Sequence, residues 1–324
     1  MDNNLVHNFA FARTALKYGL NSLKPHISNI ILVPDYICDV IFEPIQQAGF
    51  NALTYPITDS FDPDWNAIKE TLLTESISAF LLVHYFGQPQ DIDYCRKFCT
   101  ENNLFLIEDN SHGHGGQLNG QLLGTFGDIG VSSPRKILGL PFGGVLYSKN
   151  SNFVKAEKLK KIHPFCLLYY INLLKIGLSY LPKIKGQLKG WVNYANDWSN
   201  PLHDLDEHKQ DYEIGPYSLH RIASTNWSNI SYQRRSNWEK WSNFVSNNGL
   251  SPIYLSVHPE SCPWAMPVYA KNLDERNKWL KWGSKNGINI FPWPTLSKES
   301  INETGLALER WNRLLCFPLD VEPK

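Results

Sequence analysis

The chain has 324 residues and carries 31 basic and 31 acidic side chains, so its formal net charge is zero. A protein whose main partner is nucleic acid needs a cationic surface to displace counterions from phosphates, and the neutral balance argues against that class. Because 43% of the residues are apolar and 13% are aromatic, the sequence can bury a sizeable core, which excludes disorder as a global state.

The first half of the sequence alternates strand and helix patterns. Short apolar runs predict strands at Ile30–Pro34, Ser78–His84 and Leu104–Glu108. Helical spacing of apolar residues predicts helices at Asp39–Ala48 and Asp91–Asn102. Continuous apolar strands separated by helices indicate an α/β fold with a mostly parallel sheet that helices cover on both faces.

Polar residues directly follow or end these predicted strands. They are Asp35, His84 and Asp109. Ligands of parallel sheets gather beyond the carboxyl ends of the strands, so these three side chains mark the edge where we expect a site.

A basic segment extends from Lys149 to Lys189, where nine lysines stand against one acidic residue. Its middle is apolar, but Lys175 interrupts it, and a membrane span needs about 20 uninterrupted apolar residues. We expect a buried interface helix here. Contact of an amphipathic helix with a membrane surface is the less favoured alternative.

The second half contains a domain boundary in the polar, proline-containing stretch Asp197–Tyr217. We expect a large domain at residues 1–205 and a small α+β domain at 206–324. The elements predicted for the small domain are a helix at Trp227–Val245, a strand at Met266–Ala270, a helix at Asp274–Asn286 and a strand at Ile288–Pro292.

The six cysteines are scattered without a CxxC pair, and no charged-then-apolar leader opens the sequence. We therefore expect reduced thiols and a cytoplasmic protein. The close pairs His112/His114 and Cys95/Cys99 lack further ligands nearby in the sequence, so we do not expect a metal site.

The stretch from His84 to Tyr147 carries an ordered set of motifs: H-x-x-G after one strand, E-D after the next, then G-T-F-G-D-I-G and a lysine before Gly-Gly. This set resembles the DegT/DnrJ/EryC1/StrS family of fold type I aminotransferases. A weaker resemblance, which includes VPDYIC, RRSNW and a C-terminal PWP, extends from Ala12 to Leu319. The resemblance implies pyridoxal 5'-phosphate as cofactor, a homodimer, and transfer of an amino group, from glutamate, to a keto sugar attached to a nucleotide.

Two catalytic residues follow from the resemblance. Lys136 matches the lysine that forms a Schiff base with the cofactor and then moves protons. Asp109 matches the carboxylate that keeps the pyridine nitrogen of the cofactor protonated. Without the neighbouring motifs, Lys136 reads as an exposed loop residue and Asp109 as a turn residue.

The resemblance also implies a phosphate site. The family opens its first helix with a small-Gly-Thr turn, where this chain has Ala12, Arg13 and Thr14. Arg13 either changes the turn or binds the phosphate itself. Ser133 is the second expected phosphate ligand, and Ser218 is expected to reach the phosphate of the opposite subunit.

Several positions depart from the family pattern. His112 replaces a glutamine that contacts the ring hydroxyl of the cofactor, and an imidazole can donate to the same oxygen. Cys38 replaces a stacking aromatic residue, and Phe142 replaces an acidic one. Tyr36 or His84 is then the candidate to cover the ring, although either residue fits equally well as a packed strand-end side chain. His84 and Arg135 are the candidates for substrate contact, and Arg135 alternatively lowers the pKa of Lys136.

Two other functions remain open at this point. The departures at Cys38 and Phe142 favour other chemistry with the same cofactor, such as dehydration or transfer to a non-sugar acceptor. Arg13 in the phosphate turn favours a cofactor-binding regulatory protein without turnover. A related lineage that removes a hydroxyl group has histidine in place of the lysine, and Lys136 argues against that variant.

Overall fold

The structure is a computed structural model that describes residues 5–23, 28–149, 159–161, 211–293, 295–297, 301 and 305–323. The boundary expected after residue 205 lies outside these residues, as does most of the basic segment, including its apolar middle. In the described ranges, no helix combines the length and the apolar character that crossing a bilayer requires.

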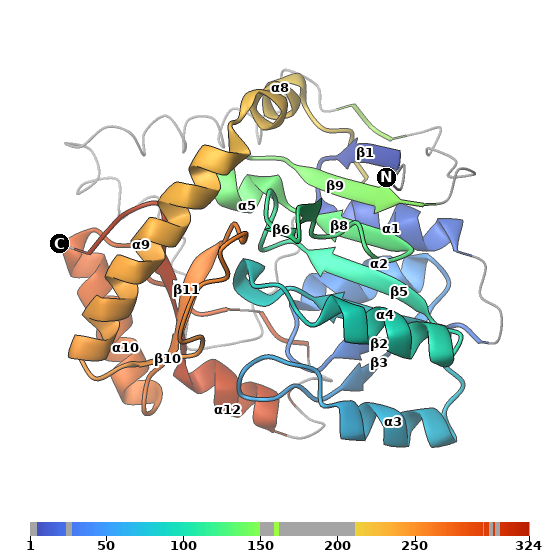
Figure 1. Cartoon of the computed structure of the whole chain (residues 1–324), viewed down its shortest axis with the longest axis horizontal. Coiled ribbons are helices and arrows are strands. Elements are labelled where there is room, and N and C mark those ends of the chain that lie inside the picture. The colour runs from blue at the N-terminus through green and yellow to red at the C-terminus, as the bar shows by residue number, and fades with distance from the viewer. Residues whose placement is uncertain are drawn as a thin grey trace.

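The N-terminal part is built on a seven-stranded sheet with the order β1-β9-β8-β5-β4-β2-β3 (Figure 1). Neighbouring strands from β3 to β8 are parallel, whereas β9 is antiparallel to both of its neighbours. The mostly parallel α/β sheet predicted from the sequence is therefore confirmed. The strands are β1 (Leu5–Phe9), β2 (Ile30–Pro34), β3 (Asn51–Tyr55), β4 (Ala79–Val83), β5 (Phe105–Asn110), β8 (Ile129–Ser132) and β9 (Gly144–Ser148).

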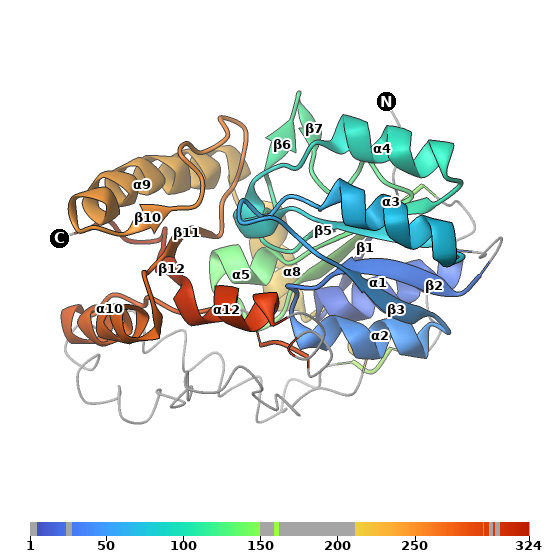
Figure 2. The same cartoon turned by 90° about the horizontal axis from the view of Figure 1, so that it is seen from below.

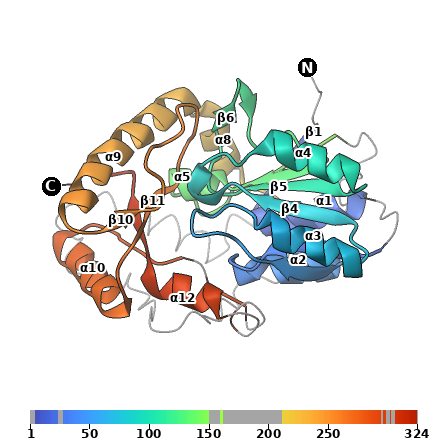
Figure 3. The ribbon, with the colours of Figure 1, turned by 60° about the horizontal axis from the view of Figure 1, so that its bottom comes forward.

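Helices cover both faces of this sheet. Figures 2 and 3 show α1 (Ala12–Ser22) and α2 (Phe42–Gln47) on one face, and α3 (Trp65–Thr74) and α4 (Ile92–Glu101) on the other. The helix predicted from Asp39 is present as a short 3₁₀ turn, η1 (Asp39–Ile41), followed by α2. α4 begins after Asp91, whose carboxylate accepts a hydrogen bond of 3.0 Å from the backbone N–H of Tyr94.

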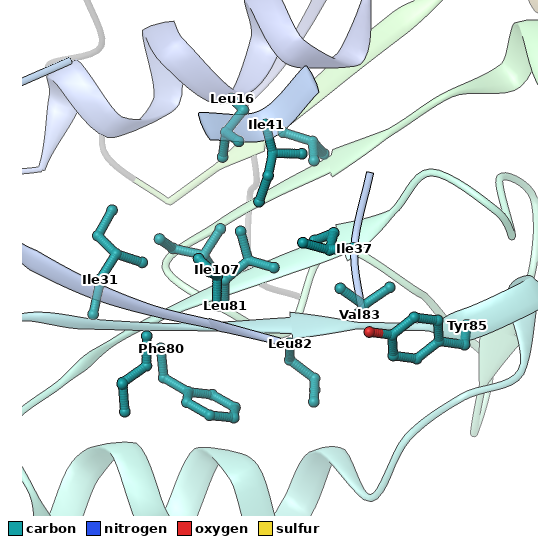
Figure 4. Packing of buried hydrophobic residues seen from close by; sticks show 14 of the residues in the cluster. Leu16, Ile31, Ile37, Ile41, Phe80, Leu81, Leu82, Val83, Tyr85 and Ile107 are labelled. Carbon is teal, nitrogen blue, oxygen red and sulfur yellow. The ribbon is translucent and has the colours of Figure 1, made fainter. Parts of the chain in front are cut away.

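The central strand β4 shows why a continuous apolar run suits this architecture. All five of its residues are buried. Successive side chains of a strand point to opposite faces, and Figure 4 shows Leu81 on the side of Leu16 and Ile41, with Phe80 and Leu82 on the opposite side. Both faces of the strand are thus packed against helices, and polar residues are left for the strand ends.

The C-terminal part folds around a smaller antiparallel sheet with the order β10-β11-β12. Its long helix α9 runs beside this sheet (Figure 1). Trp238 and Trp241 of α9 are buried in the core with Met266 and Phe317. The predicted helices and the first predicted strand of this part are confirmed. The elements are α8 (Pro216–Ser224), α9 (Trp227–Asn247), β10 (Ser251–Pro252), β11 (Ala265–Tyr269), α10 (Leu273–Asn286), α12 (Leu306–Arg313) and β12 (Leu314–Pro318).

The strand predicted at Ile288–Pro292 is wrong. Only Phe291 pairs with β12, through two backbone hydrogen bonds of 3.2 and 2.8 Å with Cys316. The N–H of Ile290 bonds instead to the carbonyl of Ile288, and Pro292 has no N–H to donate. Ile288, Ile290 and Pro292 are buried and Phe291 is half-buried, but the backbone of this segment cannot continue a ladder.

Candidate active site

The carboxyl edge of the parallel sheet gathers the polar residues that the sequence singled out. Asp109 lies opposite Val83 in the register of β5 and β4. The N–H of His84 donates to the carbonyl of Asp109 at 3.0 Å, so the ends of these two strands are fixed to each other. Asp35, His84 and Asp109 are all buried.

His84 lies beneath this edge and is fully buried. Its Nδ1 accepts a hydrogen bond from the N–H of Gln90 at 3.2 Å, and its Nε2 lies 3.0 Å from a carboxylate oxygen of Glu108. A ring nitrogen that accepts carries no proton, so the proton is on Nε2 and is donated to Glu108. Both ring nitrogens are therefore engaged within the protein, and His84 is a packed strand-end residue in this arrangement.

Glu108 explains the G-T-F-G motif. Its fully buried carboxylate accepts hydrogen bonds from the backbone N–H groups of Gly124, Phe126 and Gly127, at 3.0, 2.6 and 2.5 Å. Together with His84, these donors compensate for burying a charge. Since neighbouring residues of a strand point to opposite faces, the anchored Glu108 directs Asp109 to the other side. Sequence reasoning missed this role, although the glycine-rich loop that supplies these backbone donors is visible in the sequence.

Lys136 lies in a short helix, α5 (Pro134–Leu138), and not in a loop. Helix α5 begins after Ser133 and ends at Gly139, which has a positive φ of 63°. Burial lowers the pKa of the Lys136 amine to about 8; Asp109 and Cys38 oppose this effect and Arg135 adds to it. The structure therefore brings Lys136 into electrostatic range of three other predicted site residues.

The amine of Lys136 also meets an aromatic residue that sequence reasoning did not single out. Its Nζ lies 5.0 Å from the ring centroid of Trp264. The same indole ring packs against His112, with centroids 4.5 Å apart. The signal available in the sequence was only a tryptophan in a proline-containing loop, and nothing local connects it to Lys136.

His112 is buried between rings. Trp293 contacts it edge-on at 4.6 Å, and its Nδ1 accepts a hydrogen bond from the N–H of Phe86 at 3.2 Å. Burial and the charge of Lys136 hold the pKa of this imidazole well below its usual value. His112 is therefore neutral, with its proton on Nε2, the form that can donate to an oxygen.

Glycines allow three loops of this site, those at Gly87, His112 and Cys262, to come into close backbone contact. Gly87, in the H-x-x-G motif, has a φ of 83°, and a Cβ there would lie 2.7 Å from the carbonyl oxygen of His112 and 2.8 Å from that of Cys262. Gly116 similarly leaves no room for a side chain beside the N–H of Cys262. Gly87 and Gly116 thus allow the C-terminal loop that carries Trp264 to approach the sheet edge closely.

Two arginines form a cationic pair at this site. Arg13, at the start of α1, and Arg135, in α5, both lie against the ring of Phe11, at 4.8 and 5.4 Å from its centroid. Burial lowers the pKa of both groups, and the charge of Arg13 lowers that of Arg135 further. Two neighbouring cations of this kind form a place that favours an anion.

Buried hydroxyl groups lie near this cationic pair. Thr14 and Ser133 are buried, and the hydroxyl of Ser133 is 3.5 Å from the carbonyl of Gly143. Ser218 of α8 is 1% exposed, and its hydroxyl has no hydrogen-bond partner among the described residues.

Ser218 lies on the inner face of α8. Ile222, one turn further along this helix, approaches the turn at Gly143 and Arg135. In the single chain that the structure describes, Ser218 therefore faces its own chain, and its expected contact with the phosphate of the opposite subunit stays a prediction.

Tyr36, a candidate to cover a bound ring, and Cys38, which replaces the stacking aromatic residue of the family, have different surroundings. Tyr36 is fully buried, and its hydroxyl donates to the carbonyl of Trp293 at 2.5 Å, so it is a packed core residue. Cys38 is half-buried, with its Sγ 3.2 Å from the hydroxyl of Thr295, and burial raises its pKa. Cys38 acts electrostatically on the Lys136 amine and raises its pKa, and Phe142 packs edge-on against Phe11.

Comparisons with known proteins agree with this geometry. The sequence profile of the DegT/DnrJ/EryC1/StrS aminotransferase family matches residues 10–166. The chain is 34% identical over 282 residues to GDP-perosamine synthase of Escherichia coli O157:H7, covering 78% of this chain and 73% of that protein. It is also 32% identical to GDP-4-keto-6-deoxy-D-mannose 3-dehydratase of Yersinia pseudotuberculosis, but over only 104 residues, 32% of this chain and 26% of that one.

The fold is shared with a solved aminotransferase. The structure of Helicobacter pylori PseC, an aminotransferase involved in the biosynthesis of pseudoaminic acid, matches with a TM-score of 0.66 at 14% identity. The match covers 97% of this chain and 81% of PseC. The fold type I architecture expected from the resemblance is thereby confirmed.

Proposed function

Because this chain belongs to the DegT/DnrJ/EryC1/StrS aminotransferase family, we propose that it transfers an amino group from glutamate to a keto sugar attached to a nucleotide, with pyridoxal 5'-phosphate as its cofactor. The observation that carries this proposal is Lys136, a half-buried residue whose amine has its pKa lowered by burial to about 8, against the opposing charge of Asp109. An amine in this state is neutral for part of the time at physiological pH, which a nucleophile requires.

The residues present fit this cofactor at each of its ends. Lys136 supplies the amine for the aldehyde, Asp109 a carboxylate for the pyridine nitrogen, and His112 a neutral imidazole for the ring hydroxyl. At the phosphate end, the cationic pair Arg13 and Arg135 lies near buried hydroxyl groups. The unpartnered hydroxyl of Ser218 is a buried donor that a phosphate oxygen would satisfy.

When bound, the cofactor draws electrons from the carbon that loses its proton. Asp109 holds a proton at the pyridine nitrogen by its charge, and Glu108 keeps Asp109 in place through its own fixed hydrogen bonds. The amine of Lys136 would serve as the general base and acid that takes up a proton and returns it. His112 would hold the ring hydroxyl of the cofactor by donating from Nε2.

Dehydration is the alternative that the comparisons bring into view, because one relative is a dehydratase by name. That match covers a third of this chain, whereas the match to the synthase covers most of it. Lys136 stands where the deoxygenating lineage has histidine. Both observations support amino transfer over loss of a hydroxyl group.

The first test is the half-reaction with the amino donor. Protein purified with the cofactor should be yellow, and addition of glutamate without any sugar should bleach that absorbance. A regulatory protein without turnover would keep its colour. Protein that holds the cofactor and does not respond to any amino acid would contradict the proposal.

Arg135→Met should weaken binding of the cofactor through its phosphate. A charge-assisted hydrogen bond contributes roughly 1.5–3 kcal/mol, so we expect the affinity to fall about 10-fold to 100-fold. Titration of the cofactor-free chain with pyridoxal phosphate measures this. Arg96→Met, at an exposed position of α4, is the matched control. An equal loss of affinity for pyridoxal, which has no phosphate, would contradict the assignment.

We also propose that the enzyme is a cytoplasmic homodimer in which residues 167–181 are at least partly covered by protein. An apolar stretch of this size in the sequence invites association, and the described cysteines are free thiols, as a reducing compartment requires. Light scattering should give twice the mass of one chain.

A stable, active monomer would overturn the dimer. The membrane alternative predicts binding to anionic vesicles that falls with salt. It also predicts that this binding is lost when Lys175, Lys183, Lys185 and Lys189 are replaced by glutamine.

A further inference from the structure

We propose that Arg234 is a positioning residue for the site: it fixes the loop Ser261–Trp264 so that the ring of Trp264 is held against the amine of Lys136. Arg234 belongs to the RRSNW motif of α9. Trp238 of this motif packs in the core, but neither the fold nor the proposed chemistry has assigned a role to Arg234. The inference rests on the proposed function only in taking Lys136 as the reactive amine.

Arg234 binds the loop with a fork. Its buried guanidinium donates from Nε to the carbonyl of Pro263 and from Nη2 to the carbonyl of Trp264, both at 2.6 Å. Arginine suits two consecutive carbonyls because its donors form a rigid plane, which a lysine amine cannot reproduce. Its neighbour Arg235 donates to the carbonyl of Ser261 at 2.7 Å, at the far end of the loop.

The other side of the loop is fixed to the sheet edge. The N–H of Trp264 donates to the carbonyl of Phe86 at 3.0 Å. Next to it, Gly87 allows the carbonyl of Cys262 to approach closely. The backbone N–H of Trp264 is bound to Phe86 and its carbonyl to Arg234. Because both groups are held, the backbone has little freedom, and the direction in which the indole side chain points is fixed.

The indole side chain of Trp264 points toward the amine of Lys136. The Trp264 ring packs against His112 and against Phe291, with centroids 4.5 and 4.9 Å apart, and lies 5.0 Å from the amine. An aromatic face attracts an ammonium, but the same ring excludes water from it. Burial is the largest cause of the lowered pKa of Lys136, and the Trp264 ring, 5.0 Å from the amine, is one of the groups that bury it. We take exclusion of water as the main effect of this ring.

The other groups that act on the Lys136 amine come from different elements. Asp109 lies on β5, Cys38 precedes η1, Arg135 is its neighbour on α5, and His112 follows β5. None of them is bound by Arg234. A change at Arg234 therefore reaches Lys136 through Trp264, and this route is what the experiment isolates.

The experiment measures the reactivity of Lys136 in the cofactor-free, full-length chain. The protein is labelled briefly with trinitrobenzenesulfonate over a series of pH values, and the labelled peptide is quantified by mass spectrometry against exposed Lys69. Labelling of Lys136 in the unaltered chain should have its midpoint near pH 8. Trp264→Leu should move it upward by about one pH unit or more, because water reaches the amine.

Arg234→Met should move the midpoint in the same direction. In the double variant with Trp264→Leu, the Arg234 change should add nothing, because the two residues act along one route. Arg235→Met is the matched control, since it releases only Ser261, and its midpoint should stay where it was. If Arg234→Met fails to fold, Arg234→Lys keeps the charge with a single donor group and should give a smaller shift.

Two outcomes overturn the inference. One is an unchanged midpoint in Trp264→Leu, or in both folded Arg234 variants. The other is shifts that add in the double variant, which would mean that Arg234 does not act through Trp264. The measurement uses neither sugar nor cofactor. The inference about Arg234 is therefore tested independently of whether the chain transfers amino groups.

Discussion

Lys136→Ala is expected to abolish amino transfer while the fold is retained. The change removes the amine that must bond to the cofactor, and it leaves the ends of α5 at Ser133 and Gly139 unaltered. Activity should fall below detection, and the protein should lose the absorbance of lysine-bound cofactor. Circular dichroism and thermal unfolding should remain close to those of the unaltered chain.

Matched variants distinguish the effect of losing the primary amine of Lys136 from the effect of losing its positive charge. Lys136→Arg keeps a cation at the same position but has no primary amine, and it should be as inactive as Lys136→Ala. Lys69→Ala, at an exposed position of α3, should keep full activity. Amino transfer by either Lys136 variant would remove this residue from the mechanism.

Asp109→Asn is expected to lower turnover by at least about 100-fold, the scale on which proton control by a positioned side chain acts. An amide has the shape of the carboxylate but cannot hold the pyridine nitrogen protonated by charge. Because Asp109 raises the pKa of Lys136, its loss should also lower that pKa further. The cofactor should still bind, since the phosphate contacts remain.

The control for Asp109→Asn is the same substitution at Asp91. Asp91 caps α4, where asparagine is equally suited, so its activity should be unchanged. Steady-state rates and cofactor content are measured on both variants. A near-normal rate for Asp109→Asn would mean that Asp109 is a turn residue, holding the N–H of Ser111 at 2.8 Å, and nothing more.

The parallel sheet could be predicted because its strands are buried on both faces, which gives runs such as AFLLV in β4 that the sequence shows directly. The strand expected at Ile288–Pro292 could not be distinguished from a buried coil. The apolar pattern of this segment reflects burial alone. Strand pairing depends also on which backbone N–H groups are free to bond to a neighbouring strand.

The catalytic residues Lys136 and Asp109 could be predicted from the family pattern. The residues that surround them could not. Glu108 is fixed by N–H groups of a loop that follows it in the chain, and Trp264 reaches Lys136 from the C-terminal part. Such contacts join residues far apart in sequence, where spacing carries no signal. His84, similarly, has the residue type of a ligand-binding group, and only its two internal hydrogen bonds show that its ring is already engaged.

The most direct test of the account follows the nitrogen atom itself. The cofactor-loaded enzyme is incubated with ¹⁵N-glutamate and a panel of nucleotide-linked keto sugars, and the nucleotide sugars are analysed by mass spectrometry. The account predicts ¹⁵N in at least one product, with formation of an equal amount of 2-oxoglutarate and none with Lys136→Ala. A sugar that loses its hydroxyl group without gaining nitrogen, or an amine transferred only to non-sugar acceptors, would contradict it.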